Sequence, residues 1–179
     1  MHDSYSTILA LSLLIITTHL HAYRCEAQTE ERRRAGDVGL LLSAGVSNGA
    51  RIGVTSFILD QFSTEASFGL VRIKLLEAGD EVKHTAGYSA SLAASWYTHR
   101  DAPVSPLIFV QGSWVTADGA RIDQQRWIAC VGIGTEYSPL PSLGVFMRFG
   151  PALQTIRTRG NSASELSLQF DAGLNLFLR

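Results

Sequence analysis

Apolar residues recur at every second position along most of this chain, in segments of roughly ten residues that are separated by turn-forming residues. In the segment HTAGYSASLAASWYT (84–98) the alternation runs from Ala86 to Trp96, with Gly, Ser and Ala in between. Such alternation places the two residue sets on opposite faces of a β-strand. The pattern predicts eight strands, at residues 37–47, 50–59, 62–75, 83–98, 106–117, 125–137, 143–156 and 164–178.

Short connections join the expected strands, beginning with an Asn-Gly hairpin signal at residues 47–49. An even number of antiparallel strands joined in chain order can close on itself and so remove its exposed edges. No long amphipathic helix, Pro-rich linker or change of composition follows residue 37. We therefore expect one all-β domain at residues 37–179, an eight-stranded antiparallel up-and-down barrel. Pro151 lacks an amide hydrogen, so a bulge or an early end to pairing is expected there.

The two faces of the expected strands differ in chemistry. One is apolar and almost free of charge, whereas the other mixes Gly, Ser and Ala with a few charged residues. A soluble barrel would turn the second face to water, and such surfaces are normally rich in Lys and Glu. Only 17% of the 179 residues are charged. Small residues suit the narrow lumen of an eight-stranded barrel, so we expect the apolar face to contact lipid in a transmembrane barrel.

The opposite orientation is the main alternative. An exported soluble barrel of the calycin or lipocalin type would enclose the apolar face and bind a small apolar ligand inside. The direction in which the apolar residues point distinguishes the two hypotheses, as would membrane fractionation.

The first 27 residues have the composition of an export signal. An apolar run at residues 8–16 is too short for a membrane helix, which needs about 20 apolar residues, and small Ala27 offers a cleavage site. Residues 28–36 form a polar linker. Cleavage leaves Cys130 as the single cysteine, which excludes an internal disulfide. The remaining charges are scattered, so no nucleic-acid-binding surface is indicated.

Charged residues on the small-residue face are expected to fill the lumen. A charge removed from bulk water requires a partner, and eight strands leave little open channel. A salt-bridged network is therefore favoured over a gated pore or a polar ligand site. Its expected members are Arg51, Glu65, Arg126, Glu136, Arg148 and Asp171, with Gln111 and Gln169 nearby.

Aromatic residues on the apolar face are placed as interfacial girdles require. Trp96 and Tyr137 are expected near one rim of the barrel and Trp127 near the other. Tryptophan and tyrosine favour the boundary between hydrocarbon and water. The pattern thus agrees with a lipid-facing outer wall.

The chain ends in FDAGLNLFLR, in which Asp171, Gly173, Leu176 and Leu178 follow a polar-x-Gly-x-x-apolar-x-apolar pattern. This pattern is typical of the last strand of Gram-negative outer-membrane barrels. With the export signal and eight alternating segments, the chain from about residue 37 resembles the small outer-membrane barrel family of the OmpA transmembrane domain, OmpX and OmpW.

The resemblance implies insertion into the bacterial outer membrane by the barrel-assembly machinery, contact with outer-membrane lipid and lipopolysaccharide, and both chain ends in the periplasm. It implies no particular activity, because one fold hosts many functions. We expect a structural or membrane-anchoring protein without a cofactor.

A lipid A-modifying enzyme is the third hypothesis, because barrels of this size include such enzymes. Catalysis would need a serine activated by a nearby base. His84 and His99 lie at opposite ends of one expected strand, and neither has a His-x-Ser spacing. The sequence also lacks metal-ligand spacing and a Gly-rich phosphate loop. It therefore predicts a barrel without catalytic activity.

Overall fold

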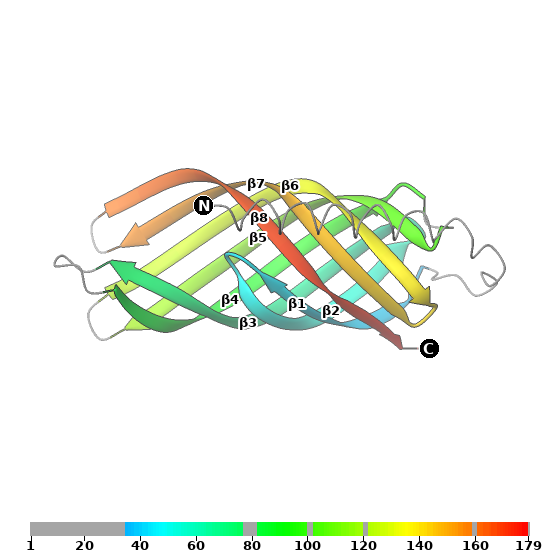
Figure 1. Ribbon diagram of the computed structural model, residues 1–179, viewed down its shortest axis with the longest axis horizontal. Helices are drawn as coiled ribbons and strands as arrows, with labels where there is room; N and C mark the ends of the chain where they lie inside the picture. Colours follow the sequence, from blue (N-terminus) through cyan, green and yellow to red (C-terminus); the bar gives the residue numbers. More distant parts are fainter. Residues whose placement is uncertain (1–34, 77–81, 100–101, 120–121, 159–160, 179) are drawn as a thin grey trace, which may run out of the picture.

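The chain folds into a closed barrel of eight antiparallel strands joined in chain order, with β8 pairing with β1 (Figure 1). The computed structural model describes residues 35–76, 82–99, 102–119, 122–158 and 161–178, so the predicted signal peptide and most of the predicted linker lie outside the described residues. The strands are β1 (Val38–Gly45), β2 (Gly49–Leu59), β3 (Phe62–Leu76), β4 (Val82–Tyr97), β5 (Val104–Gly119), β6 (Ile122–Leu140), β7 (Leu143–Thr158) and β8 (Asn161–Leu178).

The predicted all-β, up-and-down barrel is confirmed. Several strands are longer than predicted, because polar residues beyond the alternating segments continue the backbone ladders. β5 begins at Val104 and extends to Gly119, and β6 begins at Ile122, within stretches predicted as connections. Ladder hydrogen bonds join backbone groups, so a strand can continue where its side chains no longer alternate.

The prediction for Pro151 was wrong. β7 continues to Thr158, and Pro151 pairs with Leu168 of β8 without a register shift. On its other side, the β6–β7 ladder omits Val131 and Gly132 but resumes in the same register. Proline cannot donate a ladder hydrogen bond, so pairing is interrupted locally while no extra residue is inserted.

The register determines how the strands tilt. A path of paired outward-facing residues starts at Leu176 on β8 and returns to β8 at Leu166, ten residues away. With about 3.3 Å per residue and about 4.8 Å between strands, this stagger tilts the strands by about 40°. The path passes through Leu40, Val54, Ala66, Leu92, Gly112, Ala129 and Leu153.

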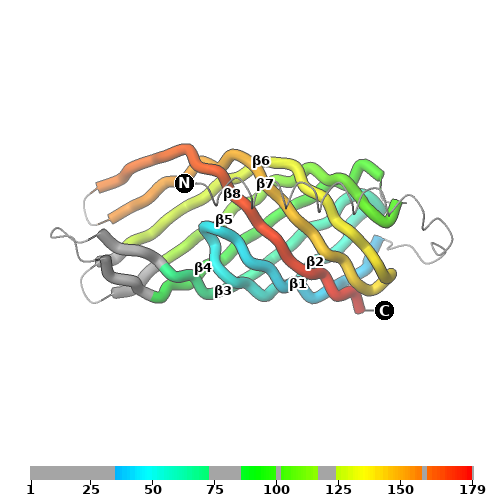
Figure 2. Tube along the Cα trace, in the orientation of Figure 1, coloured from blue at the N-terminus to red at the C-terminus, as the bar shows by residue number. Residues whose placement is uncertain are grey.

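We call the end of the barrel with Val38 and Leu178 the lower end, on the right in Figure 1, and the opposite end the upper end. Each step of the path to the next strand rises by just over one residue toward the upper end. The β1–β2 hairpin is short and turns back partway along the barrel, whereas β3 and β8 continue toward the upper end (Figure 2).

The outward-facing side chains are mostly apolar, whereas the inward-facing set combines the buried charged and polar side chains with buried apolar ones such as Phe57 and Phe109. In β1 buried and exposed residues alternate, with Leu40 and Leu42 exposed and Ser43 buried. The same holds around the wall, where Leu92 is 67% exposed and Leu168 78% exposed. The expected direction of the apolar face is confirmed, and it is the reverse of the arrangement that the calycin-type hypothesis requires.

Candidate functional site

Three aromatic residues fill the lower end of the lumen. The ring of Phe57 lies 5.4 Å from that of Tyr97 and 5.7 Å from that of Phe177, measured between centroids. All three side chains are buried. Because an eight-stranded barrel has room for little more than side chains, this cluster closes the lumen at its lower end.

Glu136 lies directly next to this aromatic cluster. The Tyr97 hydroxyl donates to its Oε2 at 2.8 Å, and the Asn175 amide Nδ2 donates to the same oxygen at 3.1 Å. Hydrogen bonds to a carboxylate are among the stronger ones in proteins. These contacts join the aromatic cluster to the polar interior above it.

A buried ion pair between Arg148 on β7 and Glu65 on β3 crosses the lumen. Arg148 Nη1 donates to Glu65 Oε2 at 2.7 Å, and Nη2 donates to Oε1, so the pair is bidentate. The guanidinium carbon lies 4.4 Å from the ring centroid of Phe146 and 5.8 Å from that of Phe109. Two-point pairing together with ring contacts fixes the guanidinium in one geometry.

A second ion pair lies above the first. Arg51 Nη2 lies 2.9 Å from Asp171 Oδ2, and Arg51 Nη1 donates to Ser91 Oγ at 3.0 Å. Ser91 in turn donates to Ser113 Oγ at 2.8 Å. Asn48, in the β1–β2 turn, lies within hydrogen-bond distance of Ser113 across the lumen. These bonds tie the turn to the far wall and fill the middle of the barrel.

Inward-facing glycines make room for the large charged side chains. A Cβ on Gly69 would lie 2.6 Å from Cγ of its paired residue Arg51, and a Cβ on Gly134 would lie 2.9 Å from Cγ of its paired residue Arg148. Such distances are far below normal van der Waals contact. Small residues on the inward face therefore leave the space that the aliphatic parts of the two arginine side chains occupy.

Five of the six expected lumen charges lie in this lower and middle region, and Arg126 does not. Arg126 is half-buried near the upper end, where its electrostatic partner is Glu165 of β8. Both amides named with the network, Gln111 and Gln169, are buried. The alternation of residues alone could not separate Arg126 from the other five charges, because it does not show how far along the barrel axis a residue lies.

Tyr97 and Ser113 were not among the residues predicted to lie in the lumen, whereas Ser91 and Asn175 were placed on the small-residue face but not in the hydrogen-bonded network. Tyr97 follows outward-facing Trp96, so alternation should have placed its hydroxyl in the lumen. Asn48 carried no such signal, since its role depends on a turn that bends toward the far wall.

The four residues of the C-terminal pattern divide between the two faces. Asp171 faces the lumen as the partner of Arg51. A Cβ on Gly173 would lie 2.7 Å from the Phe146 ring. Leu176 and Leu178 are exposed on the outer wall.

The outer wall carries an apolar band with aromatic residues along both edges. Exposed Trp96 and Tyr137 lie near the lower end, whereas Trp127 and Tyr88 lie farther up on the same two strands. Ten residues separate Trp127 from Tyr137, which at a tilt of about 40° corresponds to a height of about 25 Å. Among the described outward-facing residues within this band, none is charged.

The upper edge of the apolar band lies at nearly the same height on different strands. On five strands the outward-facing residue changes from apolar to polar within one alternation step. When the stagger is taken into account, the changes fall within about 6 Å of one height. They are Leu70 to Arg72, Trp114 to Thr116, Trp127 to Gln125, Leu153 to Thr155, and Leu166 to Ser164.

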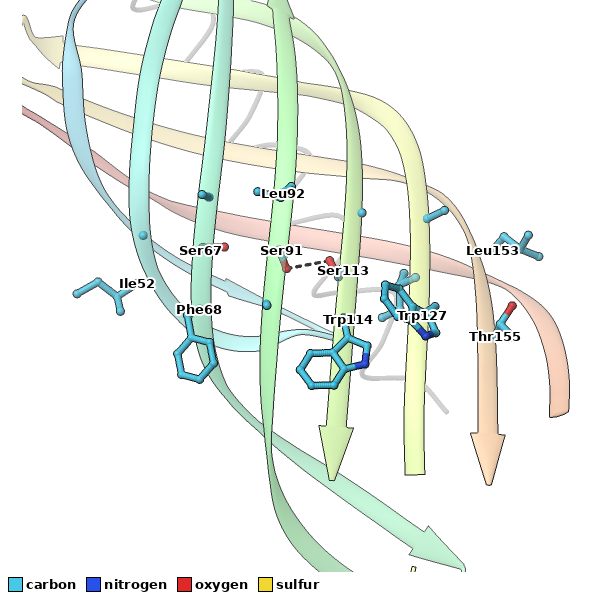
Figure 3. A pocket seen from close by; sticks show the side chains of 16 residues that line it. Ile52, Ser67, Phe68, Ser91, Leu92, Ser113, Trp114, Trp127, Leu153 and Thr155 are labelled. Atoms are coloured by element: carbon cyan, nitrogen blue, oxygen red, sulfur yellow. Dashed lines mark hydrogen bonds between the residues drawn. The ribbon is translucent and has the colours of Figure 1, made fainter. Parts of the chain in front are cut away.

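A shallow apolar hollow of about 790 Å³ follows the outer wall within the upper half of this band (Figure 3). Small residues, among them Ala66, Ala90 and Gly112, form part of its lining, and a Cβ on Gly112 would meet nothing within 4 Å. The rings of Trp114 and Trp127 lie 6.4 Å apart along it. The hollow suits flexible hydrocarbon chains because almost all of its lining is apolar.

The described residues contain no cluster of three or more His, Cys, Asp or Glu side chains that could hold a metal ion. His99 is exposed just after β4, and the side chain of His84 lies outside the described portion. Within the same portion, no helix has the length and hydropathy needed to cross a bilayer. Comparison with models of known protein families and with curated proteins finds no match to this chain.

Proposed function

We propose that this chain is an integral barrel protein of the bacterial outer membrane, exported by the segment 1–27 and inserted by the barrel-assembly machinery. It serves a structural or anchoring role, in contact with outer-membrane lipid and lipopolysaccharide. The observation that carries this proposal is the charge-free outer band with a level upper edge. Transmembrane barrels carry an apolar band about 25 Å tall between two aromatic girdles, which matches the height estimated from the strand tilt.

The interior supports the same proposal. In water, folding would leave a ring of exposed Leu, Val, Ile, Phe and Trp side chains around the whole molecule, far beyond a normal soluble surface. Lipid removes that cost, while the buried ion pairs and the aromatic cluster fill the lumen. A filled lumen favours an anchor over a conducting pore.

Membrane fractionation tests the proposal. The chain should sediment with outer membranes, resist extraction with high salt and dissolve in detergent. Without heating, the folded barrel should migrate differently from the boiled chain on a denaturing gel. A chain that stays in solution after export without detergent would contradict the membrane assignment.

The same role entails no catalytic activity. Replacing His84 or His99 by alanine should leave the lipid A composition of the cells unchanged, because neither has a serine at a catalytic spacing in the sequence. An altered lipid A profile in either variant would favour a lipid-modifying enzyme instead.

A further inference from the structure

A notch interrupts the barrel wall above the β1–β2 hairpin. β1 stops pairing with β8 at the Gly45–Asp171 pair, and β2 stops pairing with β3 at the Ala50–Leu70 pair. Above these pairs, β8 residues 161–170 and β3 residues 71–76 each have a partner strand on one side only among the described residues. In Figure 2 the β1–β2 hairpin ends partway along the barrel, while β8 continues beyond it. We call the stretch between these two strand edges, where no described strand pairs with either, the notch.

The notch gives solvent access to the inside of the wall. All residues from Asn161 to Leu166 are exposed, including Ala163 and Glu165, whose positions in the alternation face inward. Lower on β8 the alternation of buried and exposed residues resumes. The lumen is therefore open beside the upper part of β8 and closed below it.

The floor of the notch lies at the upper edge of the apolar band. Ala50 pairs with Leu70, and Leu70 pairs with Tyr88, one of the aromatic residues of that edge. If the barrel spans a membrane as proposed above, the notch opens where lipid head groups begin. Its contents therefore face polar parts of lipids rather than their hydrocarbon tails.

One side of the notch is lined by hydrogen-bonding groups. Gln169 is 1% exposed, and in the described portion neither its Nε2 nor its Oε1 has a hydrogen-bond partner. Gln154 on β7 donates to Glu165 at 2.7 Å, yet its Oε1 has no partner there either. Native proteins seldom leave buried amides unpaired. Together these groups provide both donors and acceptors for an additional molecule.

The charges of this lining offset each other. Arg126 on β6 interacts electrostatically with Glu165, while Gln154 and Gln169 are neutral. On the opposite wall the described residues Val71 and Val115 are buried and apolar. Among the described lining residues a charged head group would thus meet only Arg126 together with the carboxylate of Glu165, whereas hydroxyl groups could use donors and acceptors alike. Gln169 and Glu165 are four residues apart, about 13 Å along the strand, enough for two linked sugar rings.

We propose that the notch binds an uncharged, hydroxyl-rich group of the sugar type, carried by a lipid whose tails remain in the bilayer. Gln169 at the floor and Gln154 above it hydrogen-bond the hydroxyls. The inference rests on the proposed membrane location, because the tail supplies the local concentration and the notch opens at head-group height.

Side-chain amide NMR of the barrel in phosphatidylcholine nanodiscs tests this site. Dodecyl maltoside should shift the amide signals of Gln169 and Gln154 saturably, with half-saturation at a bulk concentration at least tenfold below that of free maltose. Dodecyl phosphocholine, which has the same tail and no sugar, should leave both signals in place. Equal shifts by the two amphiphiles would overturn the proposal. Half-saturation by maltose at the same concentration would support the site with a free sugar as its ligand.

Two variants provide a matched comparison. Gln169→Leu should raise the half-saturating concentration at least tenfold, monitored at Gln154, while Gln125→Leu, on the outer face near the same height, should not change it. Equal effects of the two would overturn the proposal. Because the wild-type titration needs no substitution, poor folding of a variant does not decide the outcome. A barrel that enters nanodiscs without any sugar-dependent shift contradicts this site alone, whereas a chain that does not enter them contradicts the membrane location as well.

Discussion

Arg148 and Glu65 are 83 residues apart in sequence, yet they form a bidentate ion pair across the lumen from opposite walls. Burying two charges costs several kcal/mol per ion unless pairing and further hydrogen bonds compensate. Here two parallel hydrogen bonds and the face of Phe146 surround the guanidinium. The pair joins strands that share no ladder and so braces the barrel across its diameter.

Removing one partner should therefore be costly. Glu65→Gln keeps the shape of the side chain but leaves the Arg148 charge buried, which typically costs about 3–5 kcal/mol. Urea unfolding of the barrel refolded into lipid vesicles, followed by tryptophan fluorescence, measures the loss. Glu165→Gln is the control, because this exposed carboxylate should contribute less than about 1 kcal/mol. Equal losses in the two variants would contradict the bracing role of the pair.

A charge placed on the outer wall should report depth in the bilayer. Val131 lies in the middle of the apolar band, and Gln125 lies beyond its upper edge on the same strand. Val131→Arg should lower the free energy of unfolding in vesicles by about 2–4 kcal/mol, and Gln125→Arg by about 0–1 kcal/mol. Equal effects of the two substitutions would be inconsistent with a bilayer around the band.

The alternation of residues predicted the strands and divided their side chains between two faces, and the small, sparsely charged composition of one face indicated that it lines the lumen. Period two holds along nearly the whole length of each strand, so Arg51 and Asp171 could both be assigned to the lumen from sequence alone. Which charges meet depends on register and stagger around all eight strands, and alternation contains neither. For this reason Arg126 was grouped with charges that lie far below it.

The notch shows a similar limit of sequence analysis. The Asn-Gly signal at residues 47–49 predicted the place of the first hairpin, but not that its two strands would be shorter than their neighbours. The notch forms because β3 and β8 continue past that hairpin on both sides. Strand lengths predicted from apolar alternation end too early there, because the upper parts of β7 and β8 are polar. The apolar alternation therefore could not predict the unpaired strand edges.

Two glycine substitutions should separate the inner from the outer face. A Cβ on Gly134 would lie 2.5 Å from the Met147 carbonyl oxygen as well as against the Arg148 stem, so Gly134→Ala should destabilise the barrel by about 1–3 kcal/mol. Gly112 faces outward with open space, so Gly112→Ala should be neutral, or stabilising by up to about 1 kcal/mol, through the reduced freedom of the unfolded chain. Urea midpoints in vesicles measure both. A larger loss at Gly112 would contradict the assigned faces.

Thiol labelling along β6 should distinguish lumen, lipid and water within a single strand. Cys130 is buried inside the barrel, so in a Cys25→Ser chain a bulky maleimide should label it only after unfolding. With Cys130 also replaced by serine, Val131→Cys should react with a charged maleimide only after unfolding, because a thiolate does not form readily in hydrocarbon and the charged reagent stays in water. Gln125→Cys, above the apolar band, should react with the same reagent in the folded barrel. Rapid labelling of Cys130 in the folded barrel, or equal labelling of the two outer positions by the charged reagent, would contradict the arrangement of a filled lumen surrounded by lipid.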